Sequence, residues 1–285
     1  MLIKPELVKK INMYFHDEES RNFEKRHTTR IKEELDFYAD FFKKNLVNKN
    51  PHPRVLDIGS GTGLVGQAMG SYNVRLVSTD ISYNMLSVAR KNVGSGIKKN
   101  IDFAICDAEK LPFCDGAFDI VTCNAAMHHF PSPAKFIAEA MRVLSRCGCM
   151  VVGFEANRRF WSNATLSIMY RIFSKLTKAS KDHGHTSYAD ICLSVNERLV
   201  AEGVISSHIN SVDMLRLVDI HSPNSGQKID RDEGFDAVWL RDNYFKPYEC
   251  TIYYHYSGLP KLIEFINRSV FAASAPKFSL IIKKK

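Results

Sequence analysis

The stretch Val-Leu-Asp-Ile-Gly-Ser-Gly-Thr-Gly at residues 55–63 decides how the chain folds. Its apolar start is typical of a buried strand, and a helix-like stretch over 64–69 follows its three glycines. Glycine adopts positive φ without strain and lets the backbone approach a ligand where a side chain would not. The stretch therefore predicts a strand, a ligand-binding loop and a helix in direct succession.

Asp57 lies at the tip of the predicted strand and bears on which ligand the loop binds. In a dinucleotide site the pyrophosphate sits at the helix N-terminus, where a neighbouring carboxylate would repel it. A ligand that carries an ammonium and a sulfonium would instead be attracted. Asp57 therefore favours S-adenosylmethionine over NAD.

Strands and helices alternate regularly from 54 to 155. Strand patterns cover 54–58, 74–80, 101–107, 118–124 and 149–155, and helix patterns cover 64–69, 84–93 and 133–145. This alternation predicts an α/β fold, a doubly wound Rossmann-like sheet of mostly parallel strands. Ligands of such sheets bind beyond the carboxyl ends of the strands. The candidate site residues are therefore those at the strand ends: Asp57, Asp80, Asp107, Asn124 and Glu155.

The rest of the chain is predicted to complete this core. Residues 1–50 have a charged helical pattern and form an N-terminal helical cap, and 51–155 form the core. The alternation stops at 156, so 156–232 is interpreted as a substrate-binding insert or lid after the fifth strand. Residues 233–285 supply a helix and two strands, which makes the sheet seven-stranded.

Composition excludes several classes of protein. With 285 residues, 45% of them apolar, the chain can bury the core of one large domain. The net charge of +8 is scattered without a basic stripe, so no nucleic-acid partner is expected. The seven cysteines have neither disulfide nor zinc spacing, so no metal site is expected. Without a signal-peptide pattern or an apolar run of about 20 residues, we expect a cytoplasmic protein.

Residues 54–155 resemble a class I S-adenosylmethionine-dependent methyltransferase, most closely the branch of quinone-biosynthesis and other small-molecule enzymes. Four ordered motifs carry the resemblance, namely the glycine loop and the segments beginning at Ser78, Cys106 and Phe118. The resemblance implies the following cofactor-binding residues: Asp57, Gly59, Ser60, Gly61, Thr62, Gly63, Asp80, Ile81, Met85, Asp107, Ala108 and Asn124.

In that family the glycine loop lies under the methionine moiety, with Asp57 facing its ammonium. Asp80 suits both ribose hydroxyls, because one carboxylate can accept two hydrogen bonds, and Met85 would pack near the adenine. Asp107 would meet the adenine amino group, and Asn124 would lie beside the sulfonium. The alternatives are local: a tight turn without ligand for the glycines, a helix N-cap for Asp80 and a turn cap for Asp107.

The predicted reaction is methyl transfer to an O or C atom of a small molecule, with lipid-like acceptors among the options, by in-line displacement. The segment after Asn124 lacks the Asn/Asp-Pro-Pro-Tyr and Pro-Cys motifs of nucleobase methyltransferases. His128 and His129 are candidate general bases, or they line the pocket. Glu155 is a candidate for orienting the acceptor, or a satisfied loop acid.

Two competing functions stay open. Gly61-x-Gly63-x-x-Gly66 formally matches the dinucleotide fingerprint of an NAD-dependent oxidoreductase, and a non-catalytic S-adenosylmethionine-binding protein would carry the same motifs. A basic amphipathic helix is predicted over 160–180, and it either docks the segment 158–178 on a membrane surface or packs on the fold. No motif identifies the acceptor or the oligomeric state.

Overall fold

A computed structural model describes residues 4–46, 52–70, 72–93, 100–177, 187–221, 234–256, 259, 264–265 and 274–284, apart from the side chains of 24–30, 171 and 173–177. It confirms the predicted fold class. The strands form one seven-stranded sheet in the order β3-β2-β1-β4-β5-β7-β6. In that order they span Ile101–Ile105, Arg75–Asp80, Arg54–Ile58, Phe118–Asn124, Leu144–Ala156, Lys277–Lys283 and Glu249–His255. β1 to β5 pair in parallel, whereas β7 runs antiparallel to both of its neighbours.

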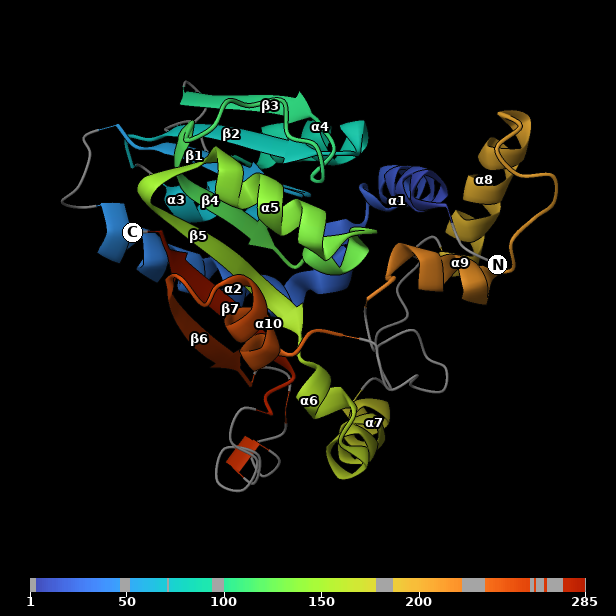
Figure 1. The fold of residues 1–285 in the computed structure, drawn as a ribbon. Helices are drawn as coiled ribbons and strands as arrows, with labels where there is room; N and C mark the ends of the chain where they lie inside the picture. The colour runs from blue at the N-terminus through green and yellow to red at the C-terminus, as the bar shows by residue number, and fades with distance from the viewer. Residues whose placement is uncertain are drawn as a thin grey trace.

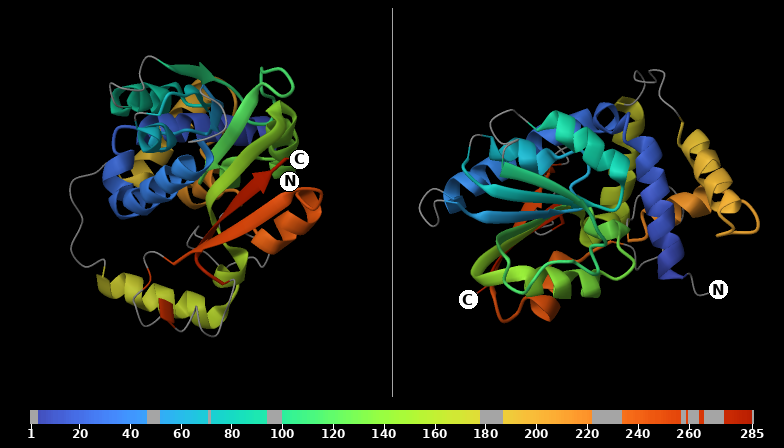
Figure 2. Two further views of the ribbon diagram at one scale, coloured as in Figure 1. Left: turned by 90° about the vertical axis from the view of Figure 1, so that its left-hand side faces the viewer. Right: turned by 90° about the horizontal axis from the view of Figure 1, so that it is seen from above.

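Helices cover both faces of the sheet (Figures 1 and 2). α2 (Phe23–Leu46), α3 (Leu64–Met69) and α4 (Tyr83–Asn92) lie on one face, and α5 (Pro133–Val143) and α10 (Ala237–Tyr244) lie on the other. Each face has its own apolar core, centred on Tyr38 and Phe42 under α2 and on Phe136 and Phe278 under α5. The central strands β1 and β4 are buried on both faces, as expected of a doubly wound sheet.

Three further helices form a separate unit beyond the carboxyl ends of the parallel strands (Figure 1). They are α1 (Pro5–Glu19), α8 (Tyr188–Ala201) and α9 (Ser211–Val218), and they share an apolar cluster that includes Ile11, Phe15, Val195 and Met214. We call them the α1/α8/α9 unit. Of the predicted cap over 1–50, α1 thus belongs to this unit and α2 covers one face of the sheet. The boundaries of the four predicted segments stay predictions.

The prediction of a single helix over 160–180 is wrong. The described part is two helices, α6 (Arg158–Trp161) and α7 (Ala164–Thr177). Asn163 Oδ1 accepts a hydrogen bond from the Leu166 amide at 3.1 Å, so it starts α7 as a new helix. Residues 178–180 lie outside the described residues. No helix in the described parts of the chain has the length and apolar character needed to cross a membrane.

Candidate functional site

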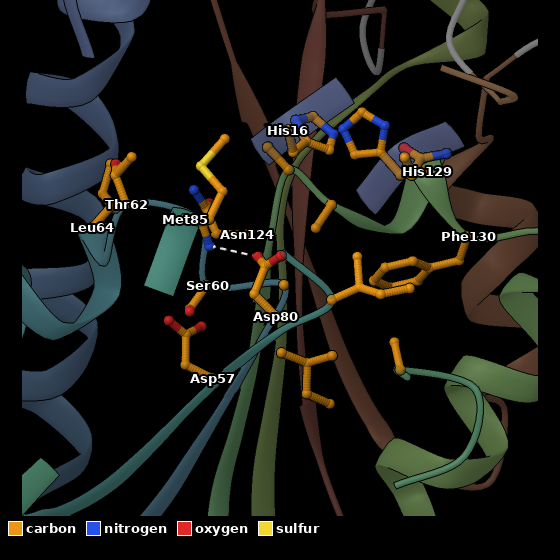
Figure 3. Close-up of a pocket in the computed structure, with 18 of the residues that line it drawn as sticks. His16, Asp57, Ser60, Thr62, Leu64, Asp80, Met85, Asn124, His129 and Phe130 are labelled. Atoms are coloured by element: carbon orange, nitrogen blue, oxygen red, sulfur yellow. Dashed lines mark hydrogen bonds between the residues drawn. The ribbon is translucent and has the colours of Figure 1, made fainter. Parts of the chain in front are cut away.

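A cavity opens at the carboxyl ends of β1, β2 and β4, between the sheet and α1 (Figure 3). Most of the residues predicted for the site line it: Asp57, Gly59, Ser60, Gly61, Thr62, Asp80, Ile81, Met85, Asp107, Ala108, Asn124 and His129. Gly63, His128 and Glu155 do not. The structure therefore brings together residues that are up to 72 positions apart, from Asp57 to His129, by placing the strand ends side by side.

The glycine loop has the backbone that its sequence predicts. Gly59, Gly61 and Gly63 all have positive φ, between 52° and 87°. A Cβ at Gly59 would lie 2.7 Å from Cβ of Ala126, so a side chain there is excluded by packing as well as by φ. At Gly61 no heavy atom of the described residues lies within 4 Å of such a Cβ. The loop thus leaves open space above Gly61, as a cradle for a ligand requires.

Asp57 is fully buried at the end of β1. Its Oδ1 accepts a hydrogen bond from Oγ1 of Thr122 at 2.8 Å, and its Oδ2 has no partner among the described residues. Burial away from water disfavours the charged form and raises the pKa of Asp57 to about 7. A cation placed at Oδ2 would satisfy this oxygen and bring the pKa down again.

Asp80 holds the glycine loop against the end of β2. Its Oδ2 accepts from the Gly61 amide and its Oδ1 from the Ser82 amide, both at 2.9 Å. Ser82, rather than Asp80, caps α4, because its Oγ accepts from the Met85 amide. Each carboxylate oxygen of Asp80 keeps a second lone pair, so the residue can also accept hydrogen bonds from a diol.

Asp107 holds a short turn and also contacts α1. Its Oδ1 accepts from the Glu109 amide at 2.9 Å, which is the turn cap considered as its alternative role. Its Oδ2 lies 2.7 Å from Nζ of Lys9, which also lies 3.0 Å from the Glu109 carboxylate. Lys9 is a site residue that the sequence patterns did not indicate, because its partners are about a hundred positions away.

Asn124 ends β4 beside a buried acid of α2. Its Nδ2 donates to Oε2 of Glu34 at 2.7 Å, and Glu34 is only 1% exposed. Both residues line the cavity. Glu34 was not a candidate in the sequence, where it is one charge among many on a helix, and only the fold brings it to the strand end.

Glu155 does not contact the cavity but anchors the short helix η2 (Met127–His129). It is fully buried; Oε1 accepts from the amides of Ala126 and Met127, and Oε2 lies 2.9 Å from Nδ1 of His128. The cause is a bulge in β5, where the pairing with β7 shifts between Val152 and Glu155. Glu155 thus positions η2, and its role toward an acceptor stays a prediction.

The two histidines have different surroundings. His128 Nδ1 is held by Glu155, behind the cavity wall. His129 lines the cavity, and its Nδ1 lies 2.7 Å from the carbonyl oxygen of Val218 at the end of α9. Burial, with the neighbouring His128 and His16, lowers the pKa of His129 well below its usual value. His16 of α1, whose ring lies 4.7 Å from that of His129 (Figure 3), is a further residue absent from the sequence predictions.

The residues present fit S-adenosylmethionine. The unpartnered Oδ2 of Asp57 suits the ammonium, the remaining acceptor capacity of Asp80 suits the ribose diol, and the open space at Gly61 suits a ligand lying on the loop. A pyrophosphate at the same loop would meet the carboxylates of Asp57 and Asp80.

Comparison with known proteins agrees with this chemistry. Residues 56–152 match the family model described as a methyltransferase domain. An uncharacterized methyltransferase of Bacillus subtilis is 39% identical over 33% of this chain and 38% of its own length. A demethylmenaquinone methyltransferase of Renibacterium salmoninarum is 35% identical over 42% of this chain and 48% of its own length. A ubiquinone/menaquinone biosynthesis C-methyltransferase of Rickettsia felis is 31% identical over 39% of this chain and 47% of its own length.

The chain spans less than half the length of these curated relatives. Among solved structures, an S-adenosylmethionine-dependent methyltransferase of Thermotoga maritima aligns over 95% of this chain and 99% of its own, with a TM-score of 0.51 and 15% identity. At that identity the likeness concerns the fold.

Proposed function

We propose that the whole chain transfers a methyl group from S-adenosylmethionine to an O or C atom of a small, lipid-like molecule, because residues 56–152 match the model of a methyltransferase domain. The observation that carries the proposal is the buried, unpartnered Oδ2 of Asp57 above an open glycine loop. A buried acceptor without a partner is costly, and a ligand ammonium removes that cost.

Bound S-adenosylmethionine supplies an electrophilic methyl group on a sulfonium. Asp57, Asp80 and Asp107 would hold its ammonium, ribose and adenine, and the glycine loop would lie under its methionine part. The transfer needs little covalent help, so most of the acceleration comes from alignment of donor and acceptor, which can supply up to about 7–11 kcal/mol. Ala126 and Phe130 line the cavity next to Gly59, where they would limit the space open to the acceptor.

The acceptor class is proposed from two observations. The cavity has apolar walls at Phe23, Ile31, Leu64 and Phe130 in addition to its cofactor residues. The relatives from Renibacterium salmoninarum and Rickettsia felis are named for quinone substrates. An amphiphilic ring compound with an apolar tail fits both.

For proton removal from the acceptor, the geometry supports His129 over His128. His129 lines the cavity, whereas His128 stands behind it on Glu155. A general base contributes about 10²–10⁴-fold, so His129→Gln should lower turnover by that range without weakening cofactor binding.

Calorimetry with S-adenosylmethionine, S-adenosylhomocysteine and NAD tests the proposal. Micromolar binding of the adenosyl ligands corresponds to about 8 kcal/mol, and Asp80→Ala should abolish it. Asp102→Ala is the matched control, because it removes an exposed acid from the adjacent strand β3, outside the cavity. Binding of NAD in place of the adenosyl ligands would favour the oxidoreductase. Adenosyl binding without turnover across phenols, quinols and amines would favour the non-catalytic protein.

We also propose a peripheral membrane contact through 158–178. Ile168 and Ile172, one turn apart on α7, are 55% and 54% exposed. Basic residues flank them in the sequence, as in helices that lie on anionic lipid. Co-sedimentation with phosphatidylglycerol vesicles should fall for Ile168→Glu and stay unchanged for Ile105→Glu, an equally exposed isoleucine on β3. Equal sedimentation of all three proteins would exclude this surface.

A further inference from the structure

The end of α9 meets η2 beside the cavity, so the α1/α8/α9 unit and the sheet each contribute to one group of side chains. His129 Nδ1 lies 2.7 Å from the carbonyl oxygen of Val218, the last residue of α9. A carbonyl oxygen can only accept a hydrogen bond, so the proton of the neutral ring is on Nδ1. Nε2 then carries the lone pair, on a ring that lines the cavity.

Asp219 lies next to the same proton. Its Oδ1 is 3.2 Å from Nδ1 of His129, and its side chain is 39% exposed while that of His129 is 18% exposed. Nδ1 therefore has the Val218 carbonyl as its hydrogen-bond acceptor and an Asp219 carboxylate oxygen within ion-pair distance, and both come from one short stretch of chain. The same Oδ1 lies 3.8 Å from Nε2 of His128.

We propose that Asp219 is a positioning residue: through Nδ1–H of His129 it holds that ring with Nε2 toward the cavity and stabilises the imidazolium that forms when Nε2 takes the acceptor's proton. The inference rests on the proposed methyl transfer. A carboxylate that orients a histidine base is a common catalytic arrangement, and here the carboxylate would come from the predicted insert 156–232.

The step balances as follows. An electron pair of the acceptor, a lone pair at oxygen or a π pair of the ring at carbon, would form the new bond to the methyl carbon, and the electrons of the broken carbon–sulfur bond would stay on sulfur as a neutral thioether. The acceptor's proton passes to Nε2 of His129, and the positive charge of the sulfonium is thereby replaced by that of the imidazolium. Solvent later takes the proton. Asp219 itself forms and breaks no covalent bond in this step.

The charge around His129 comes from every element packed against it. His128 of η2 and His16 of α1 lower its pKa together with burial, whereas Glu19 of α1 and the Val218 carbonyl oppose this effect. His16 itself has a raised pKa, which its partner Glu19 supports. His129 is therefore neutral before the reaction, and Asp219 is the nearest carboxylate that can stabilise its charged form.

This arrangement links the base to the position of the α1/α8/α9 unit. α9 packs on α1 and α8 through Met214 and Val218, so the unit holds Asp219 beside His129. The unit thus lines the cavity through α1 and also supplies the carboxylate beside the base.

The test is two-bond ¹H–¹⁵N NMR of histidine-labelled protein, with His129→Gln used to assign the signals. We expect the Nδ1–H tautomer for His129. Asp219→Asn should lower the pKa of His129 by about half a unit to one unit, because a half-exposed carboxylate acts less than the 1–3 units of a buried one. Asp219→Glu should restore it. Asp213→Asn, which removes an exposed acid from the same helix, is the matched control.

The kinetic arm uses reduced demethylmenaquinone as the probe. Asp219→Asn should lower kcat about tenfold, shift the pH profile of kcat and leave the affinity for S-adenosylhomocysteine unchanged. An Nε2–H tautomer, or an unchanged pKa of His129 in Asp219→Asn, would overturn the proposal. So would activity lost to EDTA and restored by zinc, since ligand atoms of His128, His129 and Asp219 lie within 4.8 Å of one another and could hold a cation instead. The tautomer is readable without cofactor, so failure to bind S-adenosylhomocysteine would count against the proposed function alone.

Discussion

Replacement of Asp57 by Asn should stabilise the free protein at pH 8 and weaken its binding of S-adenosylmethionine. Asn keeps an oxygen for the hydrogen bond from Thr122 but carries no charge. The free protein no longer has to bury a carboxylate with an unpartnered oxygen, so its free energy of unfolding increases. The ligand ammonium loses its counter-charge, so binding becomes weaker. A gain in stability together with a loss in affinity is expected of an acid that binds the ligand, whereas an acid that stabilises the fold would lower stability when replaced.

The magnitude follows from the pKa of Asp57, which is raised from 3.8 to about 7 in the fold. A raised carboxylate pKa means that the folded state holds the proton more tightly than the unfolded state. The stability of the wild type therefore falls as the pH rises from about 4 to 7, and the loss is complete above 7. At about 1.4 kcal/mol for each pKa unit, the loss is at most about 4 kcal/mol at pH 8.

Urea unfolding at pH 5 and pH 8 measures this effect. The difference in unfolding free energy between Asp57→Asn and wild type should grow by a few kcal/mol from pH 5 to pH 8. Groups that titrate equally in both proteins cancel, including His255, whose pKa burial lowers to about 4. Asp102→Asn should show no such growth. A variant less stable than wild type at pH 8, or one that binds S-adenosylmethionine as tightly, would refute the reasoning.

Three further outcomes are expected. Gly153→Ala should lower the melting temperature, because its Cβ would clash with the hydroxyl oxygen of Tyr38 and lie 2.8 Å from Oδ1 of Asn124; in the double variant with Tyr38→Phe, calorimetry should show part of the loss recovered. Gly59→Ala should cost about 1–3 kcal/mol of unfolding free energy, because it combines a φ of 63° with a 2.7 Å contact; a loss below about 0.5 kcal/mol would contradict the packing argument. Glu155→Gln should reduce cofactor affinity modestly and loosen η2, because the charge that accepts two amide hydrogens and holds His128 is removed; unchanged hydrogen exchange of the Ala126 and Met127 amides would argue against that anchoring role.

The cofactor half of the cavity was predictable from sequence because its determinants are local. The strand, the glycines and the acid of 55–63 are adjacent, and parallel pairing brings Asp80, Asp107 and Asn124 to the same edge. Hydrophobic patterning fixes which strands are central, and the positions of the strand ends follow.

Residues that reach the cavity from outside the alternating core were not predictable in this way. Lys9 and His16 approach it on α1, and Glu34 approaches it on α2. Each is a polar residue on an amphipathic helix, where the sequence shows which side is apolar but not what the polar side meets. Their roles depend on the tertiary arrangement alone.

The direction of the Glu155 side chain could not be predicted from the sequence pattern for a different reason, which is local backbone strain. Phe154 has a φ of 55°, which is rare for a bulky residue, and its amide donates to Oγ of Ser279 at 3.0 Å. His255 Nε2 lies 2.7 Å from the same Oγ, so a buried pair on β6 and β7 supports the bulge. The support comes from residues a hundred positions later, and it is this bulge that turns Glu155 toward His128.

The division between sheet and α1/α8/α9 unit also determines how far the relatives can be used. The family match covers 56–152, which holds the loop, the strand ends and η2. Lys9 and His16, which line the cavity, lie outside it, and so does Asp219, which contacts His129. Similarity to the quinone enzymes thus bears on the methyl donor. We expect side chains outside the match, together with Leu64, His129 and Phe130 within it, to select the acceptor. An acceptor screen guided by this chain's own α1 and α9, with quinols as one class among several, follows from that separation.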